Sequence, residues 1–78
     1  MGEIIIYVVD AYTKRDITKF WIEESHILPN VNDTICLTSI GDFVVESREF
    51  DYRYDSDYGY TKLDDITLFV YEKPKNEE

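Results

Sequence analysis

Apolar and polar residues alternate along this chain in short runs that predict β-strands. The first run, residues 3–12 (EIIIYVVDAY), is β-branched or aromatic at seven positions, which favours a strand over a helix. A polar break at 13–16 and a second apolar run follow, so we expect an antiparallel hairpin. The second run also fits one face of a helix with Asp16 as its N-cap, and a short helix near 16–24 stays open as an alternative.

The register of this hairpin decides which side chains face inward. A turn centred on Lys14 and Arg15 would pair Val9 with Phe20, and both faces of the hairpin would then be apolar. The inward face is predicted to join a core that consists of Ile5, Val9, Phe20, Ile22, Ile35, Leu37, Phe43, Val45, Leu68 and Val70. A chain this short has few residues left to cover the outward face, so we expect a homo-oligomer. Its predicted interface consists of Ile4, Ile6, Val8 and Trp21.

Three further strands are predicted after Pro29. Residues 34–38 alternate polar and apolar, residues 43–52 form a long run that needs a bend or bulge, and residues 65–71 form the last run. The predicted fold is therefore all-β: a small five-stranded antiparallel sheet, closed as a partly open barrel of SH3-like or OB-like size. We expect one domain over 1–72 and a disordered polar tail at 73–78.

The charge of the chain restricts its partners. Seventeen acidic against eight basic residues give a formal net charge of −9, and no cluster of Lys and Arg is present that could bind phosphates, so direct binding of nucleic acid is not expected. The apolar run at 4–9 is too short for a membrane span and follows Glu3 rather than basic residues. With a single cysteine, Cys36, these features predict a soluble cytoplasmic protein without membrane contact.

Catalytic and metal-binding patterns are weak. His26 is the one histidine, and no cysteine or second histidine stands at ligand spacing from it. The segment 55–59 (DSDYG) resembles the start of a calcium loop but lacks the later ligands. The serines have no base nearby in the sequence, so we expect neither an enzyme, a metal site nor a cofactor.

The densest chemistry lies at residues 49–60 (EFDYRYDSDYGY), where five aromatic residues and four acids occur within twelve positions. Tyrosine provides a broad, rigid and amphipathic contact area, so the segment predicts a binding surface. Two arginines interrupt the acidic and aromatic residues, and each is expected either to pair with an acid or to bind a phosphate. The predicted binding residues are Arg48, Phe50, Asp51, Tyr52, Arg53, Tyr54, Asp55, Asp57, Tyr58 and Tyr60.

The last two thirds of the chain resemble short uncharacterised bacterial and phage β-proteins of similar length. The resemblance rests on Leu28-Pro29, on the run from Gly41 to Tyr52 with its Phe-Val-Val strand and aromatic-acid continuation, and on the final strand at 66–71. It implies a fold and carries no activity with it.

Three functions are compatible with these features. The leading hypothesis is a phage-encoded inhibitor of a host defence protein, in which the acidic tyrosine-rich surface mimics the charge of nucleic acid and blocks a basic site. The second hypothesis is an oligomeric module that sequesters a small nucleotide through aromatic stacking and contacts with Arg48 or Arg53. The third is an accessory structural domain of a larger assembly.

Overall fold

The chain folds into a single β-sheet of five strands. The computed structural model describes residues 3–23, 28–57 and 59–74, and for 55, 60 and 61 it describes the backbone alone. The strands are β1 (Glu3–Asp10), β2 (Asp16–Glu23), β3 (Thr34–Leu37), β4 (Gly41–Asp55) and β5 (Tyr60–Glu72). The predicted all-β fold is confirmed, and the segment that also fitted a helix is a strand over Asp16–Glu23.

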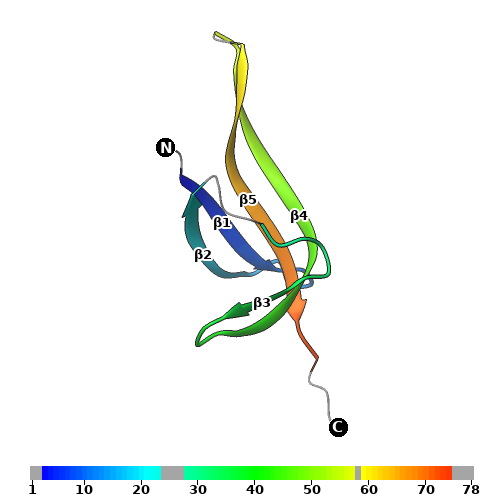
Figure 1. Cartoon of the computed structure of the whole chain (residues 1–78). Coiled ribbons are helices and arrows are strands. Elements are labelled where there is room, and N and C mark those ends of the chain that lie inside the picture. Colours follow the sequence, from blue (N-terminus) through cyan, green and yellow to red (C-terminus); the bar gives the residue numbers. More distant parts are fainter. Residues whose placement is uncertain (1–2, 24–27, 58, 75–78) are drawn as a thin grey trace.

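The sheet is curled into a half-barrel, with the strand order β2-β1-β5-β4-β3 (Figure 1). Three neighbouring pairs are antiparallel, whereas β1 and β5 run parallel and join the first hairpin to the later strands. The sheet is therefore mixed, where the apolar pattern predicted antiparallel pairing throughout. Among the described residues, no helix is long and apolar enough to cross a membrane.

The core lies on the inner face of the curled sheet. Its buried members are Ile4, Ile6, Val8, Val45, Ile66, Leu68 and Val70. The predicted core residues Val45, Leu68 and Val70 are among them, and five others are half-buried against this cluster, namely Phe20, Ile22, Ile35, Leu37 and Phe43. The prediction was wrong for Ile5, which is half-buried and lies outside the cluster, whereas Val9 is buried as predicted, although it is not a member of this cluster.

The turn between β1 and β2 explains this error. The carboxylate of Asp10 accepts hydrogen bonds from the backbone N–H groups of Tyr12 (2.8 Å) and Thr13 (3.0 Å), and Lys14 adopts a positive φ of 65°. With this longer turn, Phe20 pairs with Ile6 instead of Val9. Next to the turn, Asp10 pairs with Arg15, a shift of four residues that would keep the predicted faces, and a β-bulge at Ile17 then reduces the shift to three. Because an odd shift exchanges the two faces of a strand, the turn and the bulge together produce the observed faces.

The exchange also corrects the predicted oligomer interface. Ile4, Ile6 and Val8 are buried against their own chain, since β4 and β5 cover the face that was expected to remain bare. Trp21, the fourth residue of that interface, lies on the opposite face and is 56% exposed. An interface between copies of this chain would therefore have to use Trp21 without the other three residues.

A pair of substitutions in β1 tests this assignment of faces. Ile6→Ala should lower the free energy of unfolding by about 2–5 kcal/mol, because it opens a cavity at a position that is 1% exposed. Ile5→Ala is the matched control on the outer face, and its cost should be about 1 kcal/mol or less. Chemical denaturation of both variants measures the difference. A larger loss of unfolding free energy for Ile5→Ala than for Ile6→Ala would contradict the observed faces and support the register expected from the sequence.

Candidate functional site: the β4–β5 arm

Strands β4 and β5 extend past the rest of the sheet as a two-stranded arm. The pairing of β1 with β5 begins at Ile5 and Asp65, and β3 covers β4 only as far as Val44. Beyond Asp51 and Asp65 the two strands therefore continue as a hairpin without a third strand, and Figure 1 shows this hairpin projecting from the body of the sheet. We call residues 49–64 the arm; its base, residues 49–51, still pairs with the part of β5 that lies beside β1. The molecule is correspondingly long, with extents of 57 × 24 × 19 Å.

One face of the arm carries a stripe of aromatic side chains, which are those of Phe50, Tyr52 and Tyr54. Phe50 stands opposite Ile66 of the core, so the stripe continues the apolar inner face of the sheet. Exposure rises along it, from 0% at Val45 to 37% at Phe50, 61% at Tyr52 and 67% at Tyr54. The same face thus belongs to the core where β5 pairs with β1, and becomes an open contact surface at Tyr52 and Tyr54, beyond the end of that pairing.

Arg48 fixes the base of the stripe. Its guanidinium donates a hydrogen bond to the carbonyl of Pro29 (3.1 Å) and lies 5.3 Å from the centre of the Phe50 ring. The backbone N–H of Asn32 donates to the carbonyl of Val45 (2.8 Å), so the connection between β2 and β3 is held against β4 at two points. Arg48 therefore links the core to the arm, and its charge is already engaged within the chain.

The opposite face of the arm carries charge. Asp51 and Arg53 alternate with the aromatic residues of β4, and Arg53 lies 3.6 Å from the carboxylate of Asp64. Both partners of this ion pair are largely exposed, so it contributes at most about 1 kcal/mol to stability. The two faces of the arm therefore differ in chemistry, with aromatic rings on one face and ionic groups on the other.

Two carboxyl groups on the charged face share a proton. Asp51 and Asp65 are cross-strand partners, and a hydrogen bond with Asp51, with burial and the nearby carboxylates of Asp64 and Glu49 as further causes, raises the pKa of Asp65 to about 6. Near pH 5, Asp65 therefore keeps its proton and donates it to Asp51. As pH rises through 6, Asp65 loses this proton and this end of the sheet becomes more negative.

The structure brings together about half of the predicted binding residues. Arg48, Phe50, Tyr52 and Tyr54 share one face, while Asp51 and Arg53 lie on the other. Asp57 is exposed in the connection to β5. Tyr58 and His26 lie outside the described residues, and so do the side chains of Asp55 and Tyr60.

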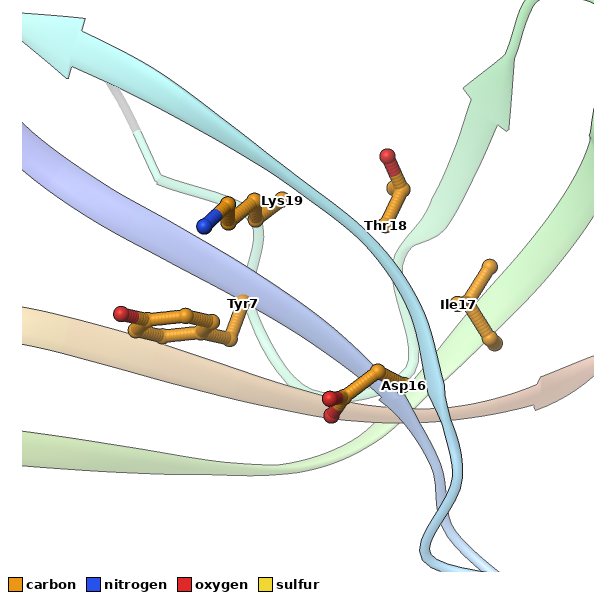
Figure 2. Close-up of a pocket in the computed structure, with 5 residues that line it drawn as sticks. All are labelled: Tyr7, Asp16, Ile17, Thr18 and Lys19. Carbon is orange, nitrogen blue, oxygen red and sulfur yellow. The ribbon is translucent and has the colours of Figure 1, made fainter.

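A second feature was not predicted from the sequence. A pocket of about 370 Å³ lies beside the first hairpin. Figure 2 shows the side chains that line it, those of Tyr7 and of residues 16–19. Tyr7 and Lys19 meet there because they are cross-strand partners in the observed register. The shorter turn assumed from the sequence paired Tyr7 with Ile22 instead, so the pocket could not be found without the correct turn.

Metal-binding groups and the single thiol of the chain also bear on its chemistry. Among the described residues, no group of three or more His, Cys, Asp or Glu side chains is placed to hold a metal ion. The thiol of Cys36 is exposed, but a hydrogen bond with Asp42 raises its pKa, which makes it a weaker nucleophile at neutral pH. Comparisons with protein-family models, curated proteins and solved structures found no match to this chain.

The shared proton predicts a specific dependence of stability on pH. Because the folded chain holds a proton at Asp65 between pH 3.8 and about 6 and the unfolded chain does not, this group stabilises the fold at low pH and the benefit disappears as pH rises through 6. Asp65→Asn should therefore raise the melting temperature at pH 7.5. The gain in the free energy of unfolding should be less than about 1 kcal/mol, because solvent screens the pair. The substitution should have little effect at pH 4.

Glu46→Gln is the control for this measurement, since it removes one charge from an exposed position of the neighbouring strand β4. Thermal melts across this pH range compare the two variants with the unmodified chain. Equal effects of Asp65→Asn at pH 4 and pH 7.5 would contradict a shared proton.

Proposed function

We propose that this chain is a non-enzymatic binding protein that docks through the arm onto a basic protein surface and blocks it. The observation that carries the proposal is the exposed aromatic stripe of Phe50, Tyr52 and Tyr54 on a projecting hairpin. Tyrosine and phenylalanine rings that are exposed in a free protein are typical anchors of protein interfaces.

The charge of the arm indicates the kind of partner. Acidic residues outnumber basic ones in residues 49–64, with five Asp or Glu against two Lys or Arg, and the chain as a whole carries a net charge of −9. Such a surface is attracted to a cluster of Lys and Arg, and it repels nucleic acid. A protein that normally binds nucleic acid presents such a cluster of Lys and Arg. The arm would compete with nucleic acid for that basic surface.

The two arginines favour this proposal over sequestration of a nucleotide. A phosphate site needs a guanidinium that is free to form paired hydrogen bonds. Arg48 is engaged with Pro29 and Phe50, and Arg53 lies beside Asp64. Arg48 thus holds the base of the arm and Arg53 faces a carboxylate on the opposite side from the rings, while the rings remain available for contact.

Alanine substitutions in the stripe test the proposal. Tyr52→Ala and Tyr54→Ala should each weaken partner binding by more than about 1 kcal/mol, since each removes a ring from the contact surface. Each should change the melting temperature little, because both side chains are more than half exposed. Tyr12→Ala is the matched control, with a tyrosine that is 75% exposed in the turn at the far end of β1.

In the assay, the unmodified chain and the variants Tyr52→Ala, Tyr54→Ala and Tyr12→Ala are each immobilised, and the proteins that each one captures are compared. A partner of the proposed kind is retained by the unmodified chain and by Tyr12→Ala, is lost from the stripe variants, and is released by salt or by double-stranded DNA. Equal losses for Tyr12→Ala and the stripe variants would contradict a site on the arm. Failure of DNA to compete would contradict the proposed kind of surface.

A further inference from the structure

Strand β2 forms one edge of the sheet, and this edge is long. It spans eight residues, Asp16–Glu23, and pairs with β1 on one side, as Figure 1 shows. The opposite edge is β3, which has four residues and is therefore too short to pair extensively. A long edge strand presents backbone N–H and C=O groups that can pair with another strand.

The side chains of β2 indicate what that other strand is. Lys19, Trp21 and Glu23 lie on the outer face of the sheet, while Phe20 and Ile22 pack against the core. The residues from Lys19 to Glu23 are therefore basic, apolar, aromatic, apolar and acidic in order. When two such strands run antiparallel, the basic end of each stands opposite the acidic end of the other, and the apolar positions stand opposite one another. We propose that two copies of the chain form a dimer by antiparallel pairing of β2 with β2, about a two-fold axis at Trp21.

In this register each of the five positions from Lys19 to Glu23 meets a suitable neighbour. Lys19 stands opposite Glu23 of the second copy, Phe20 opposite Ile22, and Trp21 opposite Trp21, so that oppositely charged and apolar cross-strand pairs form. A centre at Phe20 would place Glu23 opposite Ile17, and a centre at Ile22 would place Glu23 opposite Trp21. Both of these registers set a carboxylate against an apolar side chain.

Electrostatics within one copy support the same register. Glu3 and Glu23 are cross-strand partners in the β1–β2 hairpin, so two like charges face each other at one end of β2. The Lys19 ammonium lies 6.0 Å from the centre of the Trp21 ring, two positions along the same strand. The two-fold axis at Trp21 brings the Lys19 of each copy to the Glu3–Glu23 end of the other.

The dimer leaves the arm free. The pairing uses the outer edge of β2, whereas the arm is built from β4 and β5 on the other side of β1. Two copies would therefore join into a continuous sheet of ten strands that carries two arms. This inference stands independently of the function proposed for the arm.

Charge reversal at the edge tests the dimer. Sedimentation equilibrium of the unmodified chain should show a reversible dimer in the micromolar range. Lys19→Glu and Glu23→Lys should each weaken dimerisation by about tenfold or more, because each sets like charges opposite each other twice. The double variant Lys19→Glu/Glu23→Lys should recover the affinity to within about threefold. Lys62→Glu is the control, with an equal charge change on the arm.

A disulfide measurement tests the register itself. In a Cys36→Ser background, Trp21→Cys should form a covalent dimer on mild oxidation, because residue 21 meets its own copy at the axis. Lys19→Cys should crosslink far less, because it stands opposite residue 23. A monomer at high micromolar concentration, a double charge variant as weak as the single ones, or stronger crosslinking at 19 than at 21 would each overturn the proposal.

Discussion

The parallel pairing of β1 with β5 is the contact on which the rest of this structure depends. It sets Ile6 beside Ile66 and Val8 beside Leu68, and these four side chains are the centre of the core. The first hairpin attaches on one side of this pair, and β4 with β3 attaches on the other. In so small a domain the total stability is only on the order of 5 kcal/mol, so weakening this pair would unfold the whole sheet.

A difference in strand length then creates the candidate site. β4 has fifteen residues and β5 has thirteen, whereas β1 has eight. Where β1 ends, the inner face of β4 and β5 loses its cover, and the apolar pattern that filled the core continues as the exposed stripe. Arg48 marks this transition, since it holds the β2–β3 connection on one side and the Phe50 ring on the other. Core and contact surface are thus two parts of one face.

The number and type of strands could be predicted from the sequence because β-branched and aromatic runs separated by polar turns are strong local signals. The faces of β1 could not be predicted, because they depend on a turn that Asp10 extends by accepting two backbone hydrogen bonds and on a β-bulge between the Val8 and Val9 pairs. Apolar residues on both faces of β1 gave no independent check on that register. The parallel partner of β1 was equally hidden, since it joins strands more than fifty residues apart. The stripe was found because alternation along β4 is local, whereas the roles of Arg48 and Arg53 depended on Pro29 and Asp64.

Amide hydrogen exchange of the free chain tests most directly whether one apolar face divides into a core and an open arm. The account predicts strong protection at Ile6, Val8 and 66–70, where the parallel pair is buried, and a fall in protection beyond Phe50 along β4. Addition of a partner should then raise protection on the arm. Protection of the free arm equal to that of the parallel pair would contradict the account, because it would show that the stripe is already covered.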